Sequence, residues 1–156
     1  MPARPLTKVC YVEDDEDIQR IVRLSLERLG KMTVETVSDP LRAIEAIPRF
    51  VPDLVLLDWM MPGMDGPTLF RAMREKPETA SLPVIFITAK ASATEMTELT
   101  ALGECFLTSV SREILPVVEI DGRSGGDGRP GRVTRELSRR FAELVEREMS
   151  PIGHEA

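Results

Sequence analysis

Short apolar runs rich in β-branched residues alternate along this chain with segments of helical period. Five runs are predicted β-strands, namely Lys8–Val12, Thr33–Val37, Leu54–Asp58, Val84–Thr88 and about Cys105–Val110. This alternation is typical of a parallel sheet that helices cover on both faces. The sequence therefore predicts an α/β fold with a doubly wound, five-stranded parallel sheet, for which 2-1-3-4-5 is a common strand order.

Apolar residues at helical spacing predict which helix faces cover the sheet. The stripe that the first helix is expected to bury consists of Ile18, Ile21, Val22, Ser25 and Leu29. A third helix is predicted over Gly66–Glu75, with Leu69, Phe70 and Met73 directed inward. Together these faces would supply much of the core.

The charge balance limits the kinds of partner that are expected. The net charge of −6 at pH 7 disfavours direct contact with nucleic acid unless basic residues are segregated on one face. No apolar run approaches the roughly 20 residues that cross a bilayer, and no signal-peptide pattern begins the chain. Cys10 and Cys105 lie in predicted strands without metal-binding spacing, so both are expected to be buried thiols. We therefore predict a cytoplasmic protein with no membrane or nucleic-acid partner.

Polar side chains gather where three predicted strands end. Glu13, Asp14 and Asp15 follow the first strand, Asp58 closes the third and Thr88 closes the fourth. In a doubly wound sheet, ligands bind beyond the carboxyl ends of the strands where the winding reverses, which here lies between strands one and three. Converging carboxylates repel one another unless a cation lies among them, and Mg²⁺ prefers oxygen ligands. The sequence thus predicts a magnesium site in which Asp58 could attack phosphorus.

A simpler interpretation of these acidic residues must be weighed. An acidic residue at a strand end is often the N-cap of the next helix, and an E-D-D run is often a solvated turn. The segment Met60–Gly66 favours the functional interpretation, because Pro62 and the glycines fix the backbone beside Asp58 and present carbonyl groups to an ion.

Three blocks of this sequence resemble the receiver domains of response regulators in two-component signalling: Val12–Asp15, Asp53–Gly66 and Pro83–Ala89. The similarity covers about Thr7–Leu107 and implies a flavodoxin-like sheet, to which the later residues are expected to add a C-terminal helical extension. The Asp53–Gly66 block is the most specific of the three.

The resemblance also implies roles for individual residues. Asp58 would be the phosphorylation site, and Mg²⁺ would be held by Glu13, Asp14, Asp58 and the backbone carbonyl of Met60. Thr88 would be the switch hydroxyl. Phe106 is then the candidate aromatic switch, although an ordinary core position in the fifth strand is an equally good interpretation.

The family resemblance implies a signalling switch and not an enzyme, beyond self-catalysed phosphotransfer and slow autodephosphorylation. The phosphoryl donor would be a sensor histidine kinase or a histidine phosphotransfer protein. The signal would pass by conformational change to a downstream protein that the sequence does not identify.

The fifth strand departs from the family pattern. Receiver domains end this strand with a lysine followed by proline, whereas Ser109 or a neighbour occupies that place here, and Lys90 is a weak substitute. We therefore expect phosphorylation to be retained and the response to it to be weakened. An altered reading frame over residues 103–132 is a further interpretation of this departure.

The end of the chain predicts a separate organisation. The expected division is a receiver domain over 1–120, a glycine-rich linker over 121–132, and an amphipathic helix with its tail over 133–156. Apolar residues of that helix recur at Val133, Leu137, Phe141 and Leu144. The helix either packs on the sheet or pairs with a second copy in a homodimer.

Two other function classes stay open at this point. One is a pseudo-receiver, a phosphorylation-independent interaction module that would be indifferent to replacement of Asp58. The other is an aspartate-nucleophile phosphatase, whose general-acid aspartate would stand two positions after the nucleophile. Met60 occupies that position, so turnover of an external phosphate ester is not expected.

Overall fold

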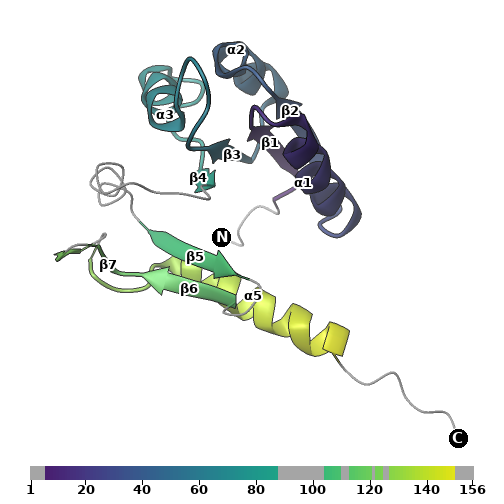
Figure 1. Ribbon diagram of the computed structural model, residues 1–156, viewed down its shortest axis with the longest axis vertical. Coiled ribbons are helices and arrows are strands. Elements are labelled where there is room, and N and C mark those ends of the chain that lie inside the picture. Colours follow the sequence, from purple (N-terminus) through teal and green to yellow (C-terminus); the bar gives the residue numbers. More distant parts are fainter. Residues whose placement is uncertain (1–5, 88–103, 110–112, 121, 125–126, 150–156) are drawn as a thin grey trace, which may run out of the picture. The chain divides into compact units, whose positions relative to one another are not determined.

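The computed structural model describes residues 6–87, 104–109, 113–120, 122–124 and 127–149. The chain divides into two compact units, Met1–Ala89 and Lys90–Ala156 (Figure 1). The predicted fourth helix, with Thr88 and Lys90 beside it, lies outside the described residues. In the part of the chain that is described, no helix is both long and apolar enough to cross a membrane.

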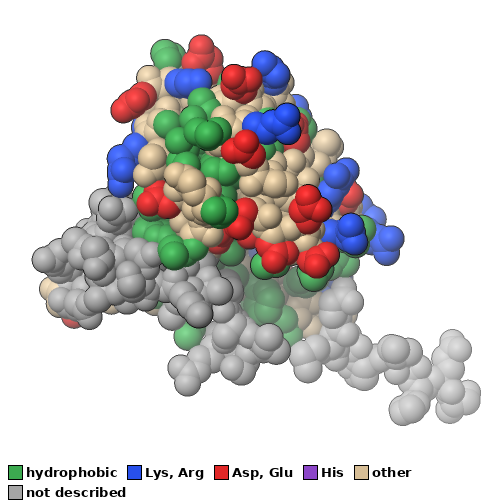
Figure 2. All heavy atoms as spheres, turned by 45° about the horizontal axis from the view of Figure 1, so that its top comes forward, with side chains coloured by type: hydrophobic (Ala, Val, Ile, Leu, Met, Phe, Trp, Pro, Cys, Tyr) green, Lys and Arg blue, Asp and Glu red, His purple; other side chains and the backbone are tan. Residues whose placement is uncertain are grey.

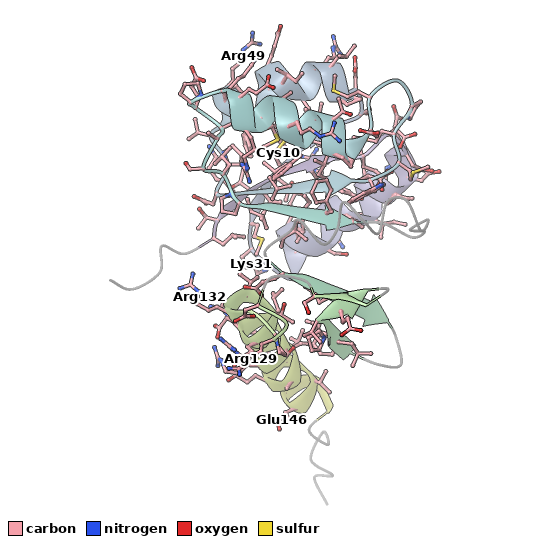
Figure 3. The ribbon with its side chains drawn as sticks, turned by 90° about the vertical axis from the view of Figure 1, so that its left-hand side faces the viewer. Cys10, Lys31, Arg49, Arg129, Arg132 and Glu146 are labelled. Carbon is pink, nitrogen blue, oxygen red and sulfur yellow. The ribbon has the colours of Figure 1, made fainter. Side chains whose placement is uncertain are left out.

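The first unit is a parallel sheet with helices on both faces. Its strands are β1 (Lys8–Val12), β2 (Thr33–Val37), β3 (Leu54–Asp58) and β4 (Val84–Ile87). Its helices are α1 (Glu16–Arg28), α2 (Pro40–Phe50) and α3 (Gly66–Glu75). The strand order is β2-β1-β3-β4, and α2 and α3 lie on the opposite face from α1 (Figures 1 and 3). The predicted α/β class and the first four positions of the predicted strand order are confirmed.

Alternation along the strands assigns residues to the two faces of this sheet. In β1, Cys10 and Val12 belong to the core on the side of α2 and α3. Val9 and Tyr11 point to the other face, since successive side chains of a strand alternate. Cys10, labelled in Figure 3, is fully buried. Burial, reinforced by the charge of Glu35, raises the pKa of its thiol to about 12. The prediction of a buried thiol at Cys10 is therefore confirmed.

Helix α1 buries a different stripe from the predicted one. Its N-cap Asp15 accepts hydrogen bonds from the backbone amides of Asp17 and Ile18, at 2.9 and 3.0 Å. This start sets the helix phase so that Gln19 is buried, while the exposed apolar residues include Ile18 (45% exposed), Ile21 (66%) and Leu29 (85%). Figure 2 shows apolar side chains reaching the surface among the charged ones. The predicted stripe is wrong except at Val22, which is partly buried, because a capped start and the hydrogen bonds that Gln19 donates outweigh apolar spacing.

The predicted fifth strand forms but does not extend the parallel sheet. Within the described residues, β5 (Cys105–Ser109) pairs antiparallel with β6 (Glu113–Val117). The short connection at 110–112 suits a hairpin between β5 and β6. The five-stranded parallel sheet is therefore corrected to four described strands. A second small hairpin joins β7 (Glu119–Ile120) to β8 (Arg123–Ser124), so that β8 falls within the segment predicted as a linker.

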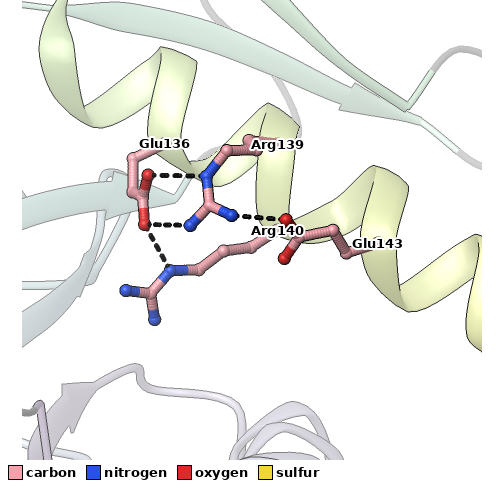
Figure 4. Close-up of polar contacts among 4 residues, drawn as sticks. All are labelled: Glu136, Arg139, Arg140 and Glu143. Carbon is pink, nitrogen blue, oxygen red and sulfur yellow. Dashed lines mark hydrogen bonds and ion pairs between the residues drawn. The ribbon is translucent and has the colours of Figure 1, made fainter.

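Helix α5 (Arg132–Met149) confirms the predicted helical extension and packs beside β6 (Figure 1). Its outer face carries a charged network in which Glu136 accepts hydrogen bonds from Arg139 and Arg140 (Figure 4). Arg139 also pairs with Glu143 one turn further on. These hydrogen bonds, that from Arg139 first, lower the pKa of Glu136 to about 2. Such exposed pairs add little to helix stability, because solvent screens them.

A carboxylate from outside the helix caps the N-terminus of α5. Glu104 accepts hydrogen bonds from the amides of Val133 (3.0 Å) and Thr134 (2.8 Å) and from the buried Thr134 hydroxyl (2.9 Å). Partial burial acts to raise the pKa of Glu104, but these hydrogen bonds outweigh it and lower the pKa. Glu104 therefore does for α5 what an N-cap side chain does elsewhere.

The substitution Glu104→Ala is expected to loosen the first turn of α5. Loss of a helix cap costs about 1 kcal/mol, so the amides of Val133 and Thr134 should exchange hydrogen roughly five- to tenfold faster. Hydrogen exchange resolved by residue checks this, with Glu143→Ala as a control that removes an exposed carboxylate from the same helix. Equal effects of the two substitutions on these amides would contradict the capping role.

Candidate functional site

Three carboxylates meet at the carboxyl ends of β1 and β3. These strands pair in register with Val12 opposite Leu57. The next residue of each is acidic, Glu13 after β1 and Asp58 at the end of β3, so the register brings the two side by side. With Asp14, they place one carboxylate oxygen each within 4.8 Å of the others. Glu13 is buried, Asp58 is partly buried and Asp14 is exposed. The cluster thus forms at the edge of the sheet where the sequence predicts a site.

The neighbours of Asp58 hold it as a partly desolvated carboxylate. The amide of Met60 donates to Asp58 Oδ2 at 3.1 Å, and the Trp59 amide continues the β3–β4 ladder to the Ile87 carbonyl at 3.0 Å. Burial, followed by the charge of Glu13, raises the pKa of Asp58 to about 6, although the amides of Trp59 and Met60 act in the opposite direction. The raised pKa of Asp58 means that a negative charge at this carboxylate is unfavourable when no cation is bound.

Glu13 is held by donors on both carboxylate oxygens. The Tyr11 hydroxyl donates to Oε2 at 2.8 Å, and the Asp15 amide donates to Oε1 at 3.3 Å. Burial, with the neighbouring Glu13 charge adding to it, raises the pKa of the Tyr11 hydroxyl, which therefore stays protonated and acts as the donor. The Glu13 backbone amide donates to the Val37 carbonyl at 3.2 Å and so extends the β1–β2 ladder.

The loop after Asp58 brings α3 close to the site. Gly63 adopts a φ of +84°, a left-handed conformation that glycine tolerates best. The Gly66 amide donates to the Trp59 carbonyl at 3.0 Å, and a Cβ at Gly66 would stand 2.3 Å from the Asp58 carbonyl oxygen. Only a glycine fits at this first residue of α3.

The donor set fits a hard divalent cation. All three groups are carboxylates, they lie within mutual reach, and burial together with the charge of Glu13 raises the pKa of the central Asp58. A small dication relieves that repulsion, and Mg²⁺ prefers oxygen ligands of this kind while keeping some of its water. The acidic cluster is therefore of the kind that the resemblance in the sequence implies.

Of the other residues predicted for the site, Met60 and Phe106 lie among the described residues. Met60 exposes its side chain and contributes its backbone amide to Asp58. Phe106 is partly buried in β5 of the second unit, and Thr88 lies outside the described residues. Tyr11 and Gln19 were not predicted as site residues from the sequence. Their only signal is a polar group at a buried position near Glu13, Asp14 and Asp15.

Comparisons with known proteins agree with this geometry. A family model described as the response regulator receiver domain matches residues 9–105. The phosphate regulon transcriptional regulatory protein PhoB of Rhizobium meliloti is 41% identical over 101 residues, which cover 63% of this chain and 43% of that protein. This chain therefore spans less than half the length of that relative.

A smaller relative and a solved structure support the same family. Chemotaxis protein CheY-3 of Vibrio cholerae is 34% identical over 96 residues, covering 62% of this chain and 74% of that protein. The receiver domain of sensor histidine kinase PA1611 from Pseudomonas aeruginosa, with magnesium coordinated in its active site cleft, superposes with a TM-score of 0.54. That similarity has 27% identity and covers 60% of this chain and 75% of that one. The chain described here belongs to the response regulator receiver domain family.

Proposed function

We propose that this chain is a phosphoacceptor in which Asp58 receives a phosphoryl group from a phosphohistidine. The observation that carries the proposal is the meeting of Glu13, Asp14 and Asp58 within 4.8 Å at the ends of adjacent parallel strands. A carboxylate that only ends a strand does not require neighbouring carboxylates. An aspartyl nucleophile that acts beside a bound cation requires them, because they hold the cation.

In the proposed reaction, a carboxylate oxygen of Asp58 attacks phosphorus. A phosphorus–oxygen bond forms as the phosphorus–nitrogen bond of the donor breaks, and the electron pair returns to the imidazole, which takes up a proton from solvent. When bound, Mg²⁺ would neutralise the carboxylates and withdraw charge from the phosphoryl oxygens. The Met60 amide, already on Asp58 Oδ2, orients the nucleophile.

The partners follow from this reaction. We propose a sensor histidine kinase or a histidine phosphotransfer protein as the donor, in the cytoplasm, and a downstream protein as the target of the conformational change. Thr88 is proposed as the switch hydroxyl and Phe106 as the switch aromatic. Since β5 contains no lysine, we propose that the phosphorylated state is stabilised less than in a typical receiver.

The test is intact-protein mass after incubation with acetyl phosphate and Mg²⁺. A gain of about 80 Da, one phosphoryl group, is expected for the full chain. The gain should vanish with EDTA and with Asp58→Asn. It should persist in Asp65→Asn, a matched control, because asparagine caps α3 as well as the aspartate that now accepts the Thr68 amide at 2.8 Å.

Two outcomes would overturn the proposal. One is an adduct that survives in Asp58→Asn. The other is the absence of any adduct under conditions that label another receiver domain, which would favour the phosphorylation-independent interaction module.

A further inference from the structure

We propose that Tyr11 is a positioning residue of the acidic site, whose hydroxyl fixes the Glu13 carboxylate in place for the cation. The inference rests on the proposed function, because it assigns Glu13 to a cation site. It concerns a side chain in the strand core, two residues before the acidic run, where an aliphatic residue would serve packing equally well.

The register of β1 brings the two side chains together. Tyr11 and Glu13 are two residues apart in extended backbone, so both side chains point to the same face of the sheet. Tyr11 is only 1% exposed, and its ring reaches along the strand so that the hydroxyl lies 2.8 Å from Glu13 Oε2. A phenylalanine at this position would fill the same space without the donor.

Glu13 has a particular need for such a donor. A glutamate has one more rotatable bond than an aspartate, so its carboxylate loses more conformational freedom when it is fixed. Tyr11 and the Asp15 amide hold one carboxylate oxygen each. The tip of the side chain is therefore ordered before a cation binds.

The backbone beneath this side chain is fixed as well. The Glu13 amide is bonded to the Val37 carbonyl, and its own carbonyl accepts from the side chain of the buried Gln19. Gln19 also donates to Ser38 Oγ at 3.1 Å. Because β2 and α1 already hold the backbone of Glu13, the Tyr11 hydroxyl controls the orientation of the Glu13 carboxylate.

Removal of this hydroxyl should therefore weaken cation binding without changing the charge of the site. In Tyr11→Phe the three carboxylates stay, but the cation must order Glu13 itself. Loss of a partner that orients a metal ligand weakens binding about tenfold or more, so we expect the dissociation constant for Mg²⁺ to rise about tenfold.

The experiment is a Mg²⁺ titration of the full chain, followed by the fluorescence of Trp59. Trp59 is the single tryptophan of the sequence and directly follows Asp58. The matched control is Thr79→Val, which removes another buried hydroxyl, one that donates to the Met73 carbonyl at 2.7 Å. Thr79→Val should leave the dissociation constant within twofold of the wild-type value.

A double-mutant cycle separates orientation from general loosening. The shorter side chain in Glu13→Asp does not reach the Tyr11 hydroxyl, so Tyr11→Phe should have no further effect on the dissociation constant in that background. Equal Mg²⁺ affinity of wild type and Tyr11→Phe would overturn the inference, as would an equal loss in Thr79→Val or an undiminished effect in the Glu13→Asp background. If the wild type itself does not bind Mg²⁺, the proposed function fails first.

Discussion

The substitution Gly66→Ala is expected to lower the free energy of unfolding of the first unit by about 3 kcal/mol. The added Cβ would stand 2.3 Å from the Asp58 carbonyl oxygen and 3.2 Å from a Phe86 ring carbon. The first of these is a backbone atom of a central strand and has no rotamer through which to move away. The start of α3 and the end of β3 must therefore separate, and the hydrogen bond from Gly66 to the Trp59 carbonyl is lost with them.

Urea unfolding followed by Trp59 fluorescence checks this expectation. The control is Gly63→Ala, where a Cβ meets no atom within 4 Å but the φ of +84° is unfavourable for alanine. That strain costs only about 1 kcal/mol. If both substitutions lower the midpoint equally, backbone conformation and not the close approach at Gly66 explains the loss.

The substitution Asp58→Asn is expected to stabilise the metal-free protein at pH 7. The pKa of Asp58 is raised from 3.8 to about 6, so the folded state holds this proton more tightly than the unfolded state. The stability that the group contributes is fully present below about pH 4 and is lost as the pH rises through about 6. After discounting for the partial exposure of Asp58, the loss is about 1–2 kcal/mol, and the asparagine avoids it.

Thermal unfolding in EDTA between pH 4 and pH 8 checks the direction. The wild-type Tm should fall by several degrees relative to that of Asp58→Asn as the pH passes through 6. Addition of Mg²⁺ should restore the wild-type Tm and leave the variant almost unchanged. Parallel pH profiles for the two proteins in EDTA would contradict the electrostatic account of Asp58.

The sequence predicted the first unit well where a single physical signal dominates. Strands β1 and β3 are largely apolar runs with side chains buried on both faces, which is typical of the central strands of a parallel sheet. Helix α1 was harder, because Ile18 and Ile21 suggest one face while Gln19 is buried against the Glu13 carbonyl. Apolar spacing does not reveal that a polar side chain will find hydrogen-bond partners inside.

The partner of β5 was a different kind of problem. An apolar strand such as Cys105–Ser109 is compatible with parallel or antiparallel pairing, and the run alone does not choose. The choice depends on the residues that follow the strand, where Pro116 disfavours a helix. In the structure Pro116 lies in β6, opposite Phe106.

The acidic residues of the candidate site were predictable from the sequence, but the side chain that orients Glu13 was not. Glu13, Asp14 and Asp58 stand out as acidic residues at strand ends, and the structure brings these three together. Tyr11 counted only as one of the apolar residues of β1. Its hydroxyl becomes relevant once the strand register places it against Glu13.

The cap on α5 also bears on the order in which the second unit is assembled during synthesis. Glu104 precedes its hydrogen-bond partners Val133 and Thr134 by 29 and 30 residues, so it leaves the ribosome well before them. The β5–β6 hairpin needs only the chain up to Val117 and can form first. A nascent chain that is released before Arg132 therefore carries the hairpin with an unused carboxylate and lacks the helix that covers it.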